Sequence, residues 1–251
     1  MRETVRLLAT LPFRIMPPRL RRRIVRAVLY ASAAGSPPDA LRELLAIDTD
    51  VSGMTDEVAL AYGGGVHVKH RLMQYHDFFV DRVRKGERVL DIGCGYGAVA
   101  HSITTRSEAS VVGLDSDPAN IAKAKTLFAH ERLDFVVGEA PRDVPTSRFD
   151  VVVISNVLEH VERRVDFLRD VQARVGASRW LVRVPMFNRD WRPSLRQELG
   201  LFPYCDPTHV TEYTREGFER EMAEAGFAAR HLQVNWGEIW ADVAPLAGAA
   251  S

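Results

Sequence analysis

The chain has 251 residues, and its 33 lysine and arginine residues are balanced by 33 aspartate and glutamate residues, so the formal net charge is zero. That length suits one α/β domain with an extension, and the charge balance gives no indication of nucleic-acid binding. Two cysteines, Cys94 and Cys205, cannot form a framework of disulfide bonds and indicate a reducing cytoplasm. No apolar run reaches the ~20 residues needed to cross a bilayer, and no secretory signal is predicted.

The neutral total hides a basic N-terminus. Residues 1–30 contain eight arginines and a single acidic residue, Glu3. Pro17 and Pro18 predict the start of a helix, because proline suits the first helical turn. Its apolar residues fall on one face: Leu20, Ile24, Val25, Val28 and Leu29. Such a helix can lie on an anionic membrane or bind an acidic substrate, or it can pack on the domain with a solvated basic face. A short helix is predicted at residues 39–46.

A run of apolar residues ends in three alternating glycines. Val89, Leu90 and Ile92 are typical of a buried parallel strand, and residues 93–97 have the pattern Gly-x-Gly-x-Gly. Glycine adopts backbone torsions that other residues avoid, and it lets a ligand approach the main chain. Because a helix is predicted directly after the turn, its positive end also faces that ligand. Asp91, at the end of the strand, can face an amino group or water near the ligand.

A second strand, residues 111–114, ends in Asp115, whose carboxylate can accept hydrogen bonds from both hydroxyls of a ribose. The spacing of Gly93, Gly95 and Gly97 differs from the G-x-G-x-x-G turn of dinucleotide enzymes. At this point the chain resembles the class I S-adenosylmethionine-dependent methyltransferases. That family carries an acidic residue, a Gly-x-Gly-x-Gly turn and a ribose-binding acid in this order.

The resemblance implies a Rossmann-like sheet of seven mostly parallel strands with a C-terminal antiparallel hairpin and helices on both faces. Residues 227–234 and 236–243 fit that hairpin. It also implies S-adenosyl-L-methionine as the cofactor and S-adenosyl-L-homocysteine as its product. Glu139 then stands where the family's acid meets the adenine amino group, and the backbone of Ala140 supplies a companion contact. The predicted cofactor-binding residues are Asp91, Gly93, Cys94, Gly95, Gly97, Asp115, Ser116, Glu139, Ala140 and Asn156.

Basic residues gather ahead of the first strand, at residues 67–71. From Lys69 onward, apolar residues recur at helical spacing, as in the helix that precedes the first strand of the resembling family. The basic residues either cap and solvate this helix, or lie over the cofactor and hold an anionic acceptor. His67 and His70 are therefore candidates for substrate binding.

Four consecutive β-branched residues, 151–154, predict a fully buried central strand. Ligands in open α/β sheets bind beyond the carboxyl ends of the strands, so Asn156, Glu159 and His160 are candidates for the reaction zone, with Glu159 assigned to substrate. His160 either caps a helix or acts as a base. The stretch resembles the family's fourth motif. In ubiquinone-biosynthesis O-methyltransferases a related Glu-x-x-Glu-His pattern is associated with a metal; Asn156 at its first position removes a charge, and we predict no metal site.

A long irregular run, residues 186–213, follows the predicted fifth strand. Loops of this length in compact domains are usually functional or contain short helices, and this position predicts a lid over the acceptor. The run resembles the loop that returns to the active site in small-molecule methyltransferases. His209 is the predicted proton acceptor, and Asp206 either orients it or caps the turn. The alternative for His209 is a histidine bonded locally in a rigid turn. Tyr213 is a candidate for substrate binding.

Methyl transfer requires mainly that the protein align the acceptor with an already activated methyl group and exclude water, which can supply ~7–11 kcal/mol at best. A hydroxyl acceptor also needs a base, and several histidines at the predicted mouth favour oxygen over nitrogen or carbon. We therefore predict O-methylation of a small molecule. A sugar or glycosylated metabolite is favoured by analogy with methyltransferases of bacterial glycan and secondary-metabolite pathways.

Two alternatives from other classes remain at this stage. One is a nicotinamide-dependent Rossmann oxidoreductase, and the other is a catalytically silent cofactor-binding partner protein at the membrane surface. The predicted organisation is an N-terminal helical extension, residues 1–66, and a methyltransferase domain, residues 67–251. The predicted partner is a small-molecule acceptor rather than nucleic acid. The predicted location is the cytoplasm, with possible peripheral membrane contact through the basic helix.

Overall fold

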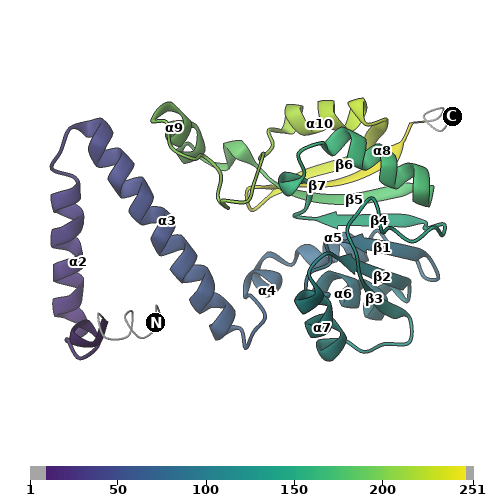
Figure 1. Cartoon of the computed structure of the whole chain (residues 1–251), viewed down its shortest axis with the longest axis horizontal. Coiled ribbons are helices and arrows are strands. Elements are labelled where there is room, and N and C mark those ends of the chain that lie inside the picture. The colour runs from purple at the N-terminus through teal and green to yellow at the C-terminus, as the bar shows by residue number, and fades with distance from the viewer. Residues whose placement is uncertain (1–9, 247–251) are drawn as a thin grey trace.

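The computed structural model describes residues 10–246. A domain built around one β-sheet carries an arm of two helices, α2 (Pro18–Ser32) and α3 (Pro37–Tyr62), which extends to one side of it (Figure 1). The first two arginines of the basic N-terminus, Arg2 and Arg6, lie outside the described residues. Among the residues described, no helix is long and apolar enough to span a membrane.

Seven strands form a single sheet in the order β3-β2-β1-β4-β5-β7-β6. The first five strands run parallel, and β7 lies antiparallel between β5 and β6. The predicted seven-stranded, mostly parallel sheet with a C-terminal antiparallel hairpin is confirmed. The strands are β1 (Arg88–Ile92), β2 (Ser110–Asp115), β3 (Leu133–Val137), β4 (Val151–Ser155), β5 (Arg179–Pro185), β6 (Phe227–Asn235) and β7 (Glu238–Pro245).

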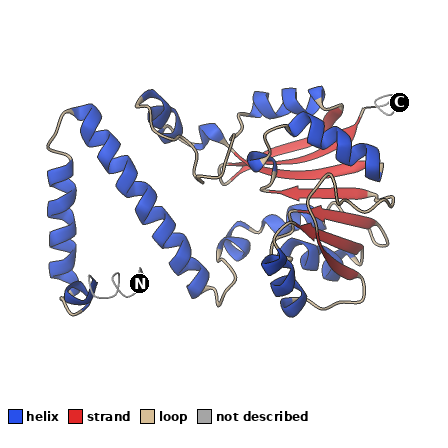
Figure 2. Ribbon diagram, viewed as in Figure 1, coloured by secondary structure: helices blue, strands red, loops and turns tan. Residues whose placement is uncertain are grey.

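Helices cover both faces of the sheet (Figure 2). One layer packs α8 (Arg164–Val175) and α10 (Arg215–Glu224) against side chains such as Leu90, Ile154 and Trp180. The other packs α5 (Tyr75–Val80), α6 (Ala98–Ser107) and α7 (Pro118–Leu127) against Val89 and Val153. Neighbouring strand residues such as Val89 and Leu90 enter opposite layers, because side chains alternate across a sheet. Their burial on both sides explains the continuous apolar strands in the sequence.

Side-chain caps define the starts of two of these helices. Asp117 precedes α7, and its Oδ1 accepts a hydrogen bond from the backbone N–H of Ala119 over 2.8 Å. Thr214 precedes α10, and its Oγ1 accepts from the backbone N–H of Gly217 over 3.0 Å. Both caps satisfy backbone donors that the first turn of a helix leaves without partners. Aspartate and threonine are both residue types preferred at this position.

Two helices differ from the sequence prediction. The short helix expected at residues 39–46 continues to Tyr62 and has 26 residues, because apolar residues persist at helical spacing through Val51, Met54 and Val58. The single helix expected from Lys69 is interrupted at Gln74, whose φ of 51° is left-handed, and this separates α4 (Lys69–Met73) from α5. The interruption turns the chain between two short helices ahead of β1.

The run of residues 186–213 contains two short helices, η2 (Phe187–Arg189) and α9 (Arg192–Glu198). The Arg196 guanidinium donates to the carbonyl of Leu45 over 2.6 Å and to Thr49 over 2.9 Å. Arg42 of α3 donates in return to the carbonyl of Leu199 over 3.1 Å. The insertion therefore holds α3 against the domain. Its role as an acceptor lid stays a prediction, as does the domain boundary at residue 66.

Gly113 of β2 lies where a side chain would collide with the glycine turn. A Cβ atom there would come within 2.7 Å of the Phe135 ring and 2.9 Å of Cys94 Sγ. We expect Gly113→Ala to lower the free energy of unfolding by about 1–3 kcal/mol, the usual result of overpacking, measured by urea denaturation. Gly35→Ala is the control, because nothing lies within 4 Å of its Cβ position. Equal stability of the two variants would contradict this packing.

Candidate active site

The glycine turn leaves β1 and leads into α6 through Gly97, the residue that precedes this helix. Gly93 and Gly95 have φ angles of 67° and 53°, in the left-handed region that favours glycine. A Cβ atom on Gly93 would lie 2.4 Å from the Val157 side chain, whereas nothing lies within 4 Å of the Cβ position of Gly95. The turn is therefore packed on one side and open to a ligand on the other.

Asp115, at the end of β2, connects the second strand to this turn. Its Oδ2 accepts a hydrogen bond from the backbone N–H of Gly95 over 2.8 Å. Its Oδ1 accepts from the backbone N–H of Asp117 over 2.9 Å and from the Asn120 side-chain amide over 3.1 Å. Asn120 was not among the predicted site residues. Its place in the first turn of α7, shortly after Asp115, could have indicated this contact. These contacts orient the carboxylate toward the carboxyl edge of the sheet.

Asp91 is a buried carboxyl group with an unsatisfied atom. Only 1% of the residue is exposed, and Oδ2 has no hydrogen-bond partner. Burial, with a further contribution from the negative charge of Asp115, raises the pKa of Asp91 to about 8. A buried polar atom without a partner is costly, so an ammonium group beside Asp91 would both satisfy the oxygen and restore its charge.

Two cavities meet at Gly93. The larger, of about 300 Å³, is lined by Asp91, Cys94, Gly95, Asn156 and Arg183, and on its outer side by Leu60, Val66, His67 and His70. The smaller, of about 260 Å³, is lined by residues from the ends of β2, β3 and β4: Asp115, Ser116, Gly138, Glu139, Ala140, Val157 and His160. Both lie beyond the carboxyl ends of parallel strands, where ligands bind in open α/β sheets.

The comparisons with known proteins agree with this geometry. The profile of a protein family described as a methyltransferase domain matches residues 65–232. The chain belongs to this family of S-adenosylmethionine-dependent methyltransferases. Its cofactor is S-adenosyl-L-methionine. Family membership also decides against the nicotinamide-dependent oxidoreductase considered as an alternative.

The similar curated proteins include ubiquinone biosynthesis O-methyltransferases. The chain is 36% identical to the one from Bradyrhizobium diazoefficiens over 109 residues, 43% of this chain and 42% of that one. It is 33% identical to the mitochondrial enzyme of Schizosaccharomyces pombe over 132 residues, 48% of either chain. The matches thus span less than half the length of these relatives.

Solved structures show the same fold. The magnesium protoporphyrin IX methyltransferase of Synechocystis, with S-adenosylhomocysteine bound, has a TM-score of 0.54 and 17% identity over 69% of this chain and 83% of that one. The putative methyltransferase of Haloferax volcanii, in complex with the Trm112 methyltransferase activator, has a TM-score of 0.57 and 14% identity over 71% of this chain and 92% of that one.

The site of this methyltransferase fits its cofactor. The unsatisfied Oδ2 of Asp91 suits the ammonium group of the amino-acid portion, and the open side of Gly95 leaves room for that portion against the main chain. Asp115 is oriented for the ribose, and Glu139 and Ala140 line the smaller cavity, where the adenine would lie. These individual roles stay predictions.

Asn156 follows β4 and faces the larger cavity with a strained backbone. Its φ of 56° is left-handed, and its buried Oδ1 has no hydrogen-bond partner. Left-handed backbone at a non-glycine residue costs energy and is concentrated at functional sites. The unsatisfied amide oxygen of Asn156 is therefore available to a ligand in the same cavity as Asp91.

A chain of hydrogen-bonded side chains leads from the larger cavity into the protein. The Tyr75 hydroxyl lies 2.7 Å from Nδ1 of His70, the same atom lies 2.9 Å from Nε2 of His76, and Nδ1 of His76 lies 2.8 Å from the Ser102 hydroxyl. Burial, followed by nearby positive charges, lowers the pKa of both histidines to about 4. Both are therefore neutral at pH 7, and His70 lines the cavity as an imidazole that can accept a proton.

Arg183 of β5 is a further site residue that sequence reasoning missed. It is 3% exposed and lines the larger cavity. Its guanidinium donates to both carboxylate oxygens of Glu238 and to the Ser155 hydroxyl, and it lies 3.8 Å from the centre of the Tyr75 ring. An arginine between two valines, Val182 and Val184, inside this strand was the available signal, because buried charges need partners.

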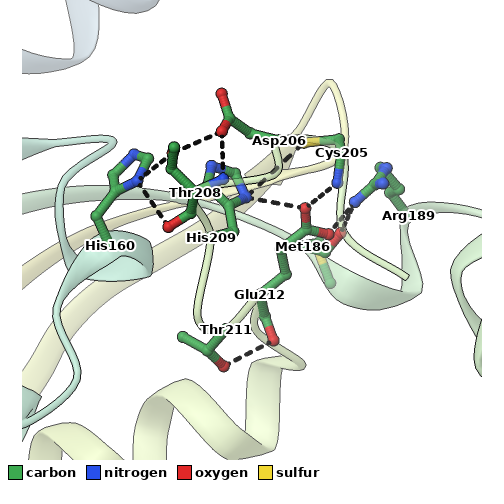
Figure 3. A network of polar contacts seen from close by, with 9 residues as sticks. All are labelled: His160, Met186, Arg189, Cys205, Asp206, Thr208, His209, Thr211 and Glu212. Carbon is green, nitrogen blue, oxygen red and sulfur yellow. Dashed lines mark hydrogen bonds and ion pairs between the residues drawn. The ribbon is translucent and has the colours of Figure 1, made fainter. Parts of the chain in front are cut away.

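His209 lies in a different network of polar contacts (Figure 3). Only 7% of it is exposed, and its Nδ1 lies 3.1 Å from Oε1 of Glu212, which also accepts from the Cys205 backbone N–H and pairs with Arg189. Burial tends to raise the pKa of Glu212, but hydrogen bonds from His209, Cys205 and Arg189 outweigh it and hold the pKa at about 2. This carboxylate is therefore ionised and fixes the orientation of the His209 ring.

The remaining predicted residues have local partners. Asp206 accepts hydrogen bonds from the backbone and hydroxyl of Thr208, and the Tyr213 hydroxyl donates to Glu221 over 2.7 Å. Neither these two residues nor His209 and Glu159 line the two cavities around the glycine turn. The structure thus brings His67, His70 and Asn156 to the larger cavity and His160 to the smaller one. The catalytic roles assigned to His209, His160 and Asp206 stay predictions.

Glu159 is a buried carboxyl group that lacks hydrogen-bond partners. It is fully buried, neither carboxylate oxygen has a hydrogen-bond partner, and burial raises its pKa to about 7. Ligand atoms of Glu159, His160 and His209 lie within 4.8 Å of one another, as do those of Cys205, His209 and Glu212. Either trio can hold a cation by donor type. The predicted absence of a metal has therefore not been tested.

Asp115 gives the first test of the cofactor site. We expect Asp115→Ala to weaken S-adenosylhomocysteine binding by about 10–100-fold, because it removes a charged hydrogen-bond acceptor worth roughly 1.5–3 kcal/mol and releases the N–H of Gly95. Titration calorimetry measures the affinity. Asp134→Ala, an exposed carboxylate on β3, is the control. Unchanged binding by Asp115→Ala would contradict the assignment of this residue to the ribose.

The pKa of Asp91 predicts a pH-dependent affinity. Below about pH 8 the unliganded carboxyl is mostly protonated, so it must lose a proton when it pairs with an ammonium group. Affinity for S-adenosylhomocysteine should therefore rise with pH from about 6 to about 8, by up to about tenfold per unit, and then level off. Calorimetry across this range measures the slope.

The control for this prediction is Asp91→Asn, which removes the titrating group and should bind weakly with no slope. His70 and His76 have pKa values of about 4 and do not titrate in this range. If Asp91→Asn kept the wild-type slope, another group such as Glu159, with a pKa of about 7, would be responsible.

Proposed function

We propose that this methyltransferase methylates an oxygen atom of a small molecule. The cofactor supplies a methyl group on a positively charged sulfur, which is already activated for transfer. The observation that carries the proposal is the larger cavity, which joins Asp91 and Gly95 to the uncharged imidazole of His70. The similar curated proteins bear the name O-methyltransferase, which supports oxygen as the acceptor atom.

His70 is the base that this geometry favours. A bound cofactor would supply the methyl group, with the electron pair of the broken carbon–sulfur bond left on sulfur in S-adenosylhomocysteine. His70 would take the proton that the acceptor hydroxyl loses as its oxygen bonds to the methyl carbon. Tyr75 and His76, both hydrogen-bonded to His70, hold the imidazole in place. A pKa of about 4 makes His70 a weak base, which suits an acidic hydroxyl such as a phenol better than an alcohol. His209 was the first choice from the sequence, but it lines neither of the two cavities around the glycine turn.

The outer walls of the cavity indicate the body of the acceptor. Leu60, Val66, Leu127 and Phe128 line it beside His67 and His70. Apolar walls with a few polar groups suit a ligand with an apolar ring or chain. We therefore propose an acceptor whose hydroxyl lies on or beside such an apolar body, and a glycosylated metabolite of this kind also meets the expectation from the sequence. A free sugar suits these walls less well.

Paired histidine variants test this proposal. We expect His70→Gln to lower kcat by about 10²–10⁴ with a phenolic acceptor, the usual worth of a general base, without weakening S-adenosylhomocysteine binding. Formation of S-adenosylhomocysteine is measured across simple phenols, glycosylated phenols and free sugars. His231→Gln, on an exposed part of β6, is the control and should keep wild-type activity.

Two results would overturn parts of the proposal. A large loss of kcat in His209→Gln with little change in His70→Gln would move the base to the network of His209. Methylation of amines with no transfer to any hydroxyl would exclude O-methylation while leaving the enzyme class intact.

A further inference from the structure

The arm presents apolar side chains to solvent. None of the residues of α2 is buried. In residues 10–32, which comprise a helical segment, a bend and α2, eight large apolar side chains are exposed: Leu11, Phe13, Ile15, Leu20, Ile24, Val25, Val28 and Tyr30. Ile15 is 83% exposed. Such a concentration of exposed apolar side chains in one segment indicates a surface that another body covers.

The same segment is strongly basic. Residues 10–36 contain six arginines and no aspartate or glutamate. Within the described part of the chain, none of the arginines from Arg14 to Arg26 forms an ion pair. The partner that covers the apolar side chains should therefore also supply negative charge.

The two kinds of side chain are arranged as an interfacial helix requires. Leu20, Ile24 and Val28 are spaced four residues apart and form one line along α2. At 100° per residue, Arg21 falls to one side of this line and Arg23 to the other. Arginines beside an apolar line can place their charged ends at phosphate level while the apolar side chains enter the acyl boundary.

A second copy of the chain offers less complementary charge. The acidic helix in the arm is α3, and most of its carboxylates already have partners within the chain. Asp39 pairs with Arg42, Glu43 accepts from Ser32, Asp48 lies 3.8 Å from Arg196, and Asp56 lies 3.3 Å from His67. An anionic surface from outside the protein would complement the charge of the six arginines better than a second copy of the chain.

We propose that α2 and the segment before it, residues 10–17, bind the surface of an anionic lipid membrane. With 15 residues, α2 is about 22 Å long, which is shorter than the ~30 Å hydrocarbon core, so the helix lies along the surface. Figure 1 shows α2 on the side of the arm away from the sheet. The arm also reaches the site, because Leu60 of α3 and Val66 just after it line the larger cavity.

Co-sedimentation with vesicles tests this inference on the full chain. Binding should be strong with phosphatidylglycerol vesicles, weak with neutral phosphatidylcholine vesicles, and reduced by salt. Arg21→Gln/Arg23→Gln should lower the partition coefficient about 30-fold, since each basic residue contributes about 1 kcal/mol near an anionic surface. Leu20→Gln/Ile24→Gln should lower it by about tenfold or more through lost apolar burial.

Arg220→Gln/Arg230→Gln is the matched control, because it removes the same charge from exposed positions on α10 and β6. It should bind vesicles like the wild type. If it lost as much binding as the α2 variants, the attraction would be a general effect of charge and the inference would fail. It would also fail if the wild type ignored anionic vesicles and formed a dimer that the Leu20/Ile24 variant dissolved, as measured by light scattering. All variants should bind S-adenosylhomocysteine normally, so this test is independent of the proposed function.

Discussion

One carboxylate holds the cofactor site together. Asp115 ends the second strand, yet it accepts a hydrogen bond from Gly95 in the turn that follows the first strand. This bond links two loops at the same edge of the sheet, and the contacts with Asp117 and Asn120 keep the carboxylate from rotating away. The open side of the glycine turn and the meeting of the two cavities at Gly93 both depend on that arrangement.

Burial and hydrogen bonding give neighbouring ionisable groups of the site different protonation states. Asp91 and Glu159 are buried without sufficient partners, and both have a raised pKa. His70 is uncharged for the same physical reason, because its ring is desolvated near Arg183 and Lys69. Glu212, in contrast, has enough hydrogen bonds to stay ionised. Asp91 lines the larger cavity, where a ligand can complete it, whereas Glu212 belongs to a rigid local network.

The sequence predicted the parts of this protein that depend on local patterns. Apolar runs located the strands, Pro17 and Pro18 located the start of α2, and the order of Asp91, the glycine turn and Asp115 identified the family. The networks around His209 and His70 were not predictable as a whole, because distant residues such as Ser102 and Arg189 complete them. His209 precedes Glu212 by only three residues, but the alignment of both with Arg189 is set by the insertion. The length of α3 was missed because Val51 and Met54 form an apolar stripe that the domain does not bury.

The central claim is that the cofactor's amino-acid portion lies in the larger cavity, between Asp91 and His70. A crystal structure of the complex with S-adenosylhomocysteine tests it most directly. The account predicts that the ligand's ammonium nitrogen lies within hydrogen-bond distance of Asp91 Oδ2, with the sulfur on the same side of the sheet edge as His70. A ligand whose sulfur faces the network of His209 and Glu212, with Asp91 still lacking a partner, would contradict it.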